Sequence, residues 1–211
     1  MGKSMKIAGT LTISDWLSLE EKIKNSPDEE ALWKEAFEFY EKRITTRYIN
    51  PIEVIQKSSD VQGEGFAICA ILCSLVEALE SFYQGKTYRK GTKKQPLDEN
   101  TEYFKSQPIF VSFLTKRAPF NKYFSENNLA SDFYDNFRCS ILHEAATRNG
   151  WVIRIGKNDL LTKEDEKLII DRDIFLNSIK EFMRSYKKEL LDDNKLKEAF
   201  IRKMKTICET A

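Results

Sequence analysis

Residues 66–83 read FAICAILCSLVEALESFY, and this apolar run predicts the central helix of the protein. Apolar side chains occur nearly all round a helical projection of the run, and a helix of that kind lies in the middle of a bundle. Glycines flank the run at Gly63, Gly65 and Gly85 and mark where the helix begins and ends. We therefore expect a helical bundle built around this run.

Two glutamates, Glu77 and Glu80, interrupt the apolar surface of this helix. Glu77 lies between Val76 and Ala78, where its carboxylate is expected to be partly buried and to need a partner. Arg138 is the partner that we expect, because a guanidinium can bind a carboxylate through two hydrogen bonds. The alternative is that Glu77 and Glu80 face solvent at an edge of the bundle.

The rest of the chain predicts further helices, because Lys, Glu and Leu are common while Gly and Pro are scarce. Ser26 and Pro27 are typical of a helix start, and Asn50-Pro51 is expected to end the helix that follows. The expected helices span part of residues 15–24 and residues 26–47, 52–57, 101–115, 129–148, 173–191 and 194–206, with a polar loop over 86–100.

Residues 151–155 read WVIRI and alternate as a strand does, and residues 167–170 are their expected partner in a small hairpin. The expected fold class is therefore all-α, a helical bundle forming a single domain over residues 1–211 with a β-hairpin inserted at 151–170. The structure of residues 1–25 is left open. Core positions expected in the helix over 101–115 are Phe104, Phe110 and Phe113.

The composition of the 211 residues limits the function classes. A net charge of +1 argues against bulk electrostatic capture of nucleic acid, although a small site with local positive charge remains compatible with it. With one His and no CxxC motif, we expect no metal site and no cofactor. The chain shows no signal peptide and no uncharged apolar stretch long enough for a membrane span, so we expect a cytoplasmic protein with reduced thiols and no membrane contact.

His143 is the only histidine of the chain and follows Arg138 in the segment FRCSILH, residues 137–143. Histidine is the side chain that both takes and gives a proton near neutral pH. Any acid–base chemistry that depends on a histidine must therefore use His143. The alternative is that His143 is a surface residue without a role.

On a helix, the apolar side chains of this region form one stripe that faces the core. His143 falls nearly opposite that stripe, in a row with Cys139, while Arg138 lies on its flank. Arg138 and His143 are then about 140° apart, which is not a shared face. One ligand touches both only if Arg138 reaches around, the helix bends, or a second copy of the chain supplies one of them. The expected stripe consists of Phe133, Tyr134, Phe137, Ile141 and Ala145.

The polar loop carries five basic residues around Tyr88. Basic and aromatic side chains together can hold a nucleic-acid backbone, which makes these residues candidate RNA contacts. The alternative is a solvated surface loop, because charge runs commonly mark such segments. The five residues are Lys86, Arg89, Lys90, Lys93 and Lys94.

The segment of residues 137–143 resembles the signature of the HEPN superfamily, an Arg followed after four to six residues by a His on a late helix. The surrounding sequence also resembles that of a widespread group of bacterial proteins. The similar stretches are Gly65 to Ile68, Glu77 to Glu80, Phe133-Tyr134 and Gly150-Trp151. The resemblance implies a HEPN-like all-α bundle and a metal-independent ribonuclease, often a toxin or phage-defence effector. It also implies a homodimer in which two motif helices meet, an RNA substrate, and an antitoxin or other protein partner.

Carried over to this chain, the resemblance implies catalytic roles for Arg138 and His143. His143 would move the proton of a ribose 2′-hydroxyl, and Arg138 would stabilise charge at the attacked phosphorus. Glu77 and Cys139 would support them. Members of the superfamily often carry Asn, Asp or His directly after the Arg, whereas Cys139 stands there in this chain and is a weak hydrogen-bonding group. This departure favours the alternative of a non-catalytic HEPN-like helical module that binds a nucleotide or a protein partner.

Overall fold

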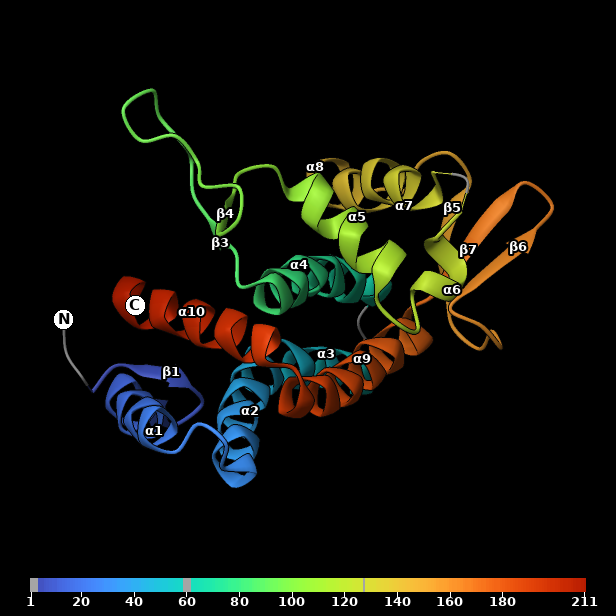
Figure 1. Ribbon diagram of the computed structural model, residues 1–211. Helices are drawn as coiled ribbons and strands as arrows, with labels where there is room; N and C mark the ends of the chain where they lie inside the picture. The colour runs from blue at the N-terminus through green and yellow to red at the C-terminus, as the bar shows by residue number, and fades with distance from the viewer. Residues whose placement is uncertain (1–3, 59–61, 127) are drawn as a thin grey trace. The chain divides into compact units, whose positions relative to one another are not determined.

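The computed structural model describes residues 4–58, 62–126 and 128–211, and contacts divide the chain into two compact units (Figure 1). Helices α3 (Asn50–Lys57), α4 (Glu64–Gln84) and α9 (Arg172–Asp192) each contribute residues to both units. The expectation of a single domain stays a prediction. The terminal unit comprises Met1–Pro51, Ser81–Phe104 and Met183–Ala211, and the central unit comprises Ile52–Glu80 and Lys105–Phe182.

The terminal unit is built on aromatic packing between helices. Tyr40 of α2 packs against Phe82, Tyr186 and Phe200, and Trp16 of α1 packs against Phe200 as well. Two pairs of short strands accompany the helices, one antiparallel and one parallel. The elements are β1 (Lys6–Ala8), β2 (Leu11–Thr12), α1 (Ile13–Asn25), α2 (Glu30–Ile44), the π-helix η1 (Thr45–Ile49), β3 (Thr87–Tyr88), β4 (Glu102–Tyr103) and α10 (Asn194–Thr210).

The central unit combines helices with a three-stranded sheet. Strand β7 lies in the middle of this sheet, parallel to β5 and antiparallel to β6. Its helical part carries the Arg138–His143 segment on one continuous helix made of α7, η2 and α8. The elements are α3 (Asn50–Lys57), α5 (Ser106–Lys116), α6 (Asn121–Phe124), α7 (Leu129–Asp132), the π-helix η2 (Phe133–Cys139), α8 (Ser140–Glu144), β5 (Trp151–Arg154), β6 (Leu161–Glu164) and β7 (Lys167–Asp171).

The prediction of an all-α fold is wrong. Helix makes up 64% of the protein, but the described residues also form seven strands in three sheets, one of them mixed. Strands of two to five residues offer too few alternating positions for the apolar pattern to show. The protein therefore has a mostly helical fold with a small mixed sheet.

The predicted hairpin is also wrong in its connection. Strand β5 does pair with β7, but the two run parallel, with Val152 opposite Ile169. The hairpin is instead formed by β6 and β7. A tight turn joins the two strands, and in it Asp165 adopts the left-handed conformation (φ 51°). An Asp tolerates that conformation better than most residues do, so the turn favours the β6–β7 pairing.

Several predicted helix boundaries differ from the structure. Ser26 follows the end of α1 instead of starting α2, whose first residue is Glu30. The predicted break at Asn50-Pro51 is wrong, because α2 continues through η1 into α3 with Pro51 as its second residue. Pro51 has no N–H to donate. The helix tolerates it because Pro51 lies in the first turn of α3, directly after the wider turns of η1.

Five of the eight core positions predicted in the helices over 101–115 and 129–148 are buried. Phe110 and Phe113 of α5 are buried as predicted, but Phe104 precedes α5 and is 41% exposed. Ala145 lies outside the motif helix and is exposed. The predicted stripe is confirmed at its buried centre, which consists of Phe133, Phe137 and Ile141.

Helix α4 confirms the central helix predicted from residues 66–83. Among the described residues, it is the one helix long and apolar enough to cross a membrane by length and composition alone. More than half of its most apolar window, 56%, is buried within the protein, as in the core helix of a soluble protein.

Candidate functional site

Glu77 of α4 and Arg138 of η2 form an ion pair within the central unit. Arg138 Nη2 lies 3.5 Å from Glu77 Oε2, and each side chain is 16% exposed. Ser106, the first residue of α5, donates its hydroxyl to Glu77 Oε1 at 2.9 Å. The predicted pairing is confirmed, and the alternative of a solvated Glu77 is wrong.

The guanidinium of Arg138 is held on several sides. It lies over the ring of Tyr134, 5.1 Å from the ring centre, and Nη1 contacts the sulfur of Cys139 at 3.8 Å. Its Nε is buried and donates no hydrogen bond to any residue that the structure describes. Burial raises the pKa of the Tyr134 hydroxyl, Cys139 and Glu77 raise it further, and the charge of Arg138 opposes the shift. Arg138 is therefore fixed in place while one of its N–H groups still lacks an acceptor.

The helix that carries Arg138 is wound as a π-helix from Phe133 to Cys139. The π-helix includes Arg138 and Cys139, while residues 140–143 are α-helical, so the winding affects only a small part of the angle expected between Arg138 and His143. π-turns inside α-helices occur frequently at functional sites. The sequence pattern contains no signal for this winding, because the same apolar residues face the core in both forms.

His143 is exposed in the last turn of α8, so its predicted position off the core is confirmed. The side chain of His143 forms no hydrogen bond or ion pair with the residues that the structure describes. The helix ends at Glu144, not at Arg148 as predicted, because Ala145 adopts the left-handed conformation (φ 52°). The segment after it folds back, and the Arg148 N–H donates to the carbonyl of Asn136 at 2.9 Å.

A second buried ion pair, which the sequence analysis missed, lies one turn along α4 from Glu77. Arg117 at the end of α5 donates from Nε and Nη2 to the two oxygens of Glu80, at 2.8 and 2.9 Å. Ser112 donates its hydroxyl to Glu80 at 2.8 Å, and the Glu80 side chain has no exposed surface. The sequence indicates that Glu80 needs a partner, because it is a carboxylate in an apolar run. No spacing in the sequence indicates that this partner is Arg117.

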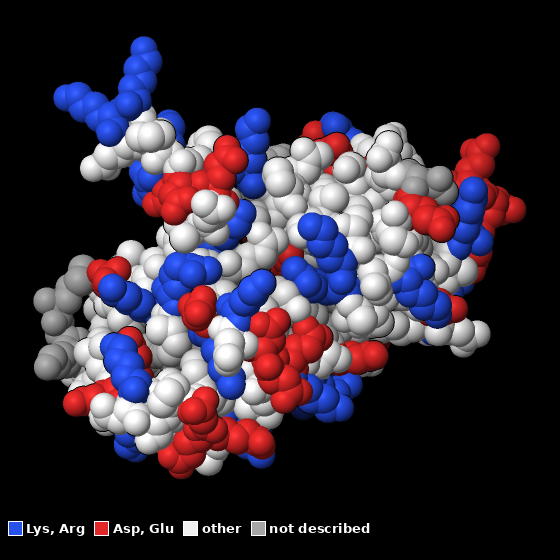
Figure 2. Space-filling model, in the orientation of Figure 1, with Lys and Arg blue, Asp and Glu red and all other residues white. Residues whose placement is uncertain are grey.

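The basic loop over residues 86–94 belongs to the terminal unit. Arg89 is not available as an RNA contact, because it binds both oxygens of Glu102 and the carbonyls of Gln95 and Pro96. Lys86 is half-buried. Figure 2 shows Lys and Arg side chains projecting from this part of the surface. Of the basic and aromatic residues in the loop, Tyr88, Lys90, Lys93 and Lys94 are exposed.

The cysteines are free thiols. Burial raises the pKa of Cys69 and Cys73 in α4, and it raises the pKa of Cys208 in α10 to about 11. Across residues 4–58, 62–126 and 128–211, no three His, Cys, Asp or Glu side chains lie together in a way that could hold a metal ion.

Comparison of the chain with protein-family models, with curated proteins and with solved structures returned no match. The function is therefore inferred from the site alone.

Proposed function

We propose that the protein is a metal-independent endoribonuclease of the HEPN type that acts as a homodimer in the cytoplasm. The observation that carries this proposal is the contrast between two residues of one helix. Arg138 is held in position by Glu77 and Tyr134, while the side chain of His143 is exposed and makes no hydrogen bond or ion pair with any described residue. A fixed positive charge and an exposed proton-transfer group are the two side chains that phosphodiester cleavage needs.

In this reaction, His143 removes the proton of a ribose 2′-hydroxyl, which then attacks the adjacent phosphorus. The 5′-oxygen of the next nucleotide leaves as the P–O bond breaks and takes a proton from water, His143 gives its proton back to the solvent, and the product ends in a 2′,3′-cyclic phosphate. Arg138 stabilises the negative charge that builds up on the phosphate oxygens, using the N–H groups that Glu77 does not bind.

The dimer answers a geometric difficulty of the single chain. Arg138 is mostly enclosed, at 16% exposed, whereas His143 stands on the outer surface of the last helical turn. A two-fold axis beside the motif helix would place His143 of one chain near Arg138 of its partner. Such a nuclease would serve as a toxin or phage-defence effector, held in check by an antitoxin or another protein.

A non-catalytic module that binds a nucleotide or a protein partner is the second candidate. The observation that favours it is that Arg138 already has Glu77 as a counter-ion and Cys139 in contact. A guanidinium neutralised in this way binds a phosphate less strongly, and a thiol offers little hydrogen bonding in return.

Cleavage of total RNA separates the two candidates. Wild-type protein, His143→Ala and the matched surface variant Glu144→Ala are incubated with RNA, and the ends of the products are analysed. Cleavage by the wild type and Glu144→Ala, lost in His143→Ala, supports the nuclease. Full activity of His143→Ala refutes the mechanism, and inactivity of pure wild-type protein on several RNAs favours the binding module.

A further inference from the structure

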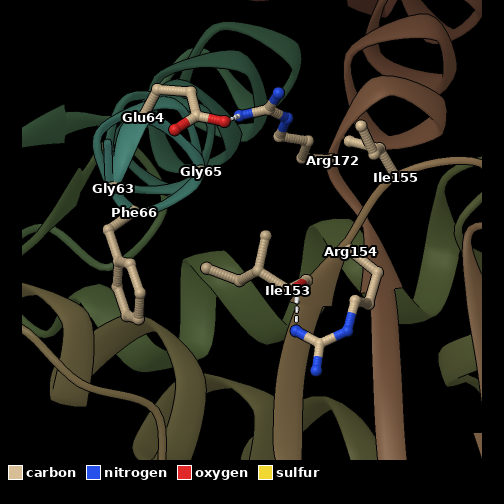
Figure 3. A pocket seen from close by; sticks show the side chains of 8 residues that line it. All are labelled: Gly63, Glu64, Gly65, Phe66, Ile153, Arg154, Ile155 and Arg172. Atoms are coloured by element: carbon tan, nitrogen blue, oxygen red, sulfur yellow. Dashed lines mark hydrogen bonds and ion pairs between the residues drawn. The ribbon is translucent and has the colours of Figure 1, made fainter. Parts of the chain in front are cut away.

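The central unit contains a pocket of about 280 Å³ between the first turn of α4 and the end of β5. Figure 3 shows the guanidinium of Arg172 facing the carboxylate of Glu64 at its upper wall, with Phe66 and Ile153 below them. The remaining lining residues are Gly63, Gly65, Arg154 and Ile155.

Arg172 is the most unusual residue of this pocket. It is 7% exposed, and its Nη1 donates to Glu64 Oε1 at 2.8 Å. Its Nε is buried and donates no hydrogen bond to any described residue, although Asp173 Oδ1 lies 3.6 Å away. An unsatisfied N–H on a buried cation is costly. Because the Nε of Arg172 is shielded from solvent, a ligand in the pocket can meet only the other N–H groups of this side chain.

The charges around the pocket favour an anion. Arg154 and Arg172 are the two cations of the lining and Glu64 is its one carboxylate. Arg172 also has Asp173 beside it at 3.6 Å, so the uncompensated charge of the pocket lies at Arg154. The guanidinium of Arg154 bonds only to the carbonyl of Ile153 among the described residues, so its charge is not compensated there. The first turn of α4 lines the pocket, and the N-terminus of a helix favours negative charge. A single negative charge matches this site.

The remaining walls are apolar. Phe66 is 39% and Ile155 is 56% exposed, and both are among the exposed large apolar residues of the protein. Gly65 leaves the space between α4 and Ile153 free. A Cβ at this position would lie 3.2 Å from the side chain of Ile153 and 3.7 Å from that of Arg172. The volume lies just below the range of about 300–1,000 Å³ that is usual for drug-sized ligands, so the occupant is small.

We propose that this pocket binds a small monocarboxylate with an apolar body. Its carboxylate meets Arg172 and Arg154, and its hydrocarbon part lies against Phe66, Ile153 and Ile155. The proposal is independent of the ribonuclease proposal, since none of these residues belongs to the Arg138–His143 site.

Titration calorimetry with hexanoate tests the proposal, with 1-hexanol as the neutral analogue and inorganic phosphate as the anion without an apolar body. We expect hexanoate to bind with roughly millimolar affinity or better, and neither analogue to match it. Binding of hexanol or phosphate as tight as that of hexanoate, or no binding of hexanoate, would overturn the proposal.

Two variants locate the binding. Arg172→Gln removes the cation, and Ile155→Glu places a negative charge on an exposed wall position where it does not disturb the core. Each is expected to weaken hexanoate binding by about tenfold or more, whereas the exposed control Arg148→Gln binds like the wild type. If Arg172→Gln fails to fold, Ile155→Glu decides alone, and unchanged affinity of a folded Ile155→Glu refutes the site.

Discussion

The carboxylate of Glu77 and the guanidinium of Arg138 lie 3.5 Å apart, and water still reaches 16% of each side chain. One turn along α4, the carboxylate of Glu80 binds Arg117 through two hydrogen bonds and has no exposed surface. Two ion pairs of the same type, on one helix, therefore differ in geometry and in enclosure. They attach α4 to the motif helix in one case and to the end of α5 in the other.

This difference predicts unequal costs of removing the two glutamates. Glu80→Ala leaves Arg117 without its two-point partner in the interior and is expected to lower the free energy of unfolding by about 3–5 kcal/mol. Glu77→Ala is expected to cost about 1–3 kcal/mol, because the contact of Glu77 with Arg138 is longer and partly hydrated. Urea unfolding followed by circular dichroism measures both, and a larger loss in Glu77→Ala would contradict the structure.

The left-handed conformation of Ala145 predicts a neutral or stabilising glycine. The Cβ of an alanine costs about 1–2 kcal/mol in this conformation, and glycine removes that cost while losing about 0.4–1 kcal/mol through its more flexible unfolded chain. Ala145→Gly is therefore expected to keep or raise the melting temperature. Ala67→Gly, at an exposed position inside α4, is the control and is expected to cost about 1 kcal/mol. Equal losses in both variants would show that Ala145 is helical in solution.

The positions of the long helices could be predicted from sequence because their apolar residues recur with the helical period over many turns. Helix α4 is the clearest case, and its polar interruption at Glu77 also predicted the contact with Arg138. The partner of Glu80 could not be found in this way, because Arg117 follows α5 at a position that only the folded chain brings to α4.

The short strands and the winding of the motif helix could not be predicted. β3 and β4 have two residues each, so their pairing depends on where the loop between them folds, not on a pattern within them. The π-turns at Phe133–Cys139 leave the core-facing residues Phe133 and Phe137 unchanged, so an apolar pattern read with the α-helical period does not reveal them.

Burial of the thiols predicts their order of reaction with a disulfide reagent at pH 8. Cys69 and Cys73 are buried and their pKa values are raised, so they form little thiolate in the folded protein. Cys139 and Cys208 are partly exposed and are expected to react first, with Cys208 slowed by its pKa of about 11. Absorbance should then show at most two reactive thiols before unfolding and four in denaturant. Rapid reaction of all four thiols in the native protein would contradict the buried position of α4.

The proposed chemistry predicts that Arg138 and His143 are both needed for RNA cleavage. General acid–base catalysis contributes about 10²–10⁴-fold, and a loss of this size is expected in His143→Ala. Arg138→Lys is also expected to be poorly active, because a point charge cannot replace the planar guanidinium at a phosphate. Cleavage is expected to persist in EDTA. Loss of activity in EDTA that added Mg²⁺ restores would show that the proposed mechanism is wrong.

A site that takes His143 from one chain and Arg138 from the other requires a homodimer, which light scattering at micromolar concentration detects. It further predicts that two inactive variants restore each other. In a mixed dimer of His143→Ala and Arg138→Lys, one of the two sites combines an intact His143 with an intact Arg138 from the other chain. Because half of the randomly assorted dimers are mixed, activity should recover to roughly a quarter of that of the wild type. Each variant alone, at the same total concentration, is the control. A dimer that shows no recovery would place Arg138 and His143 of each site on one chain, and a monomer would remove the shared site altogether.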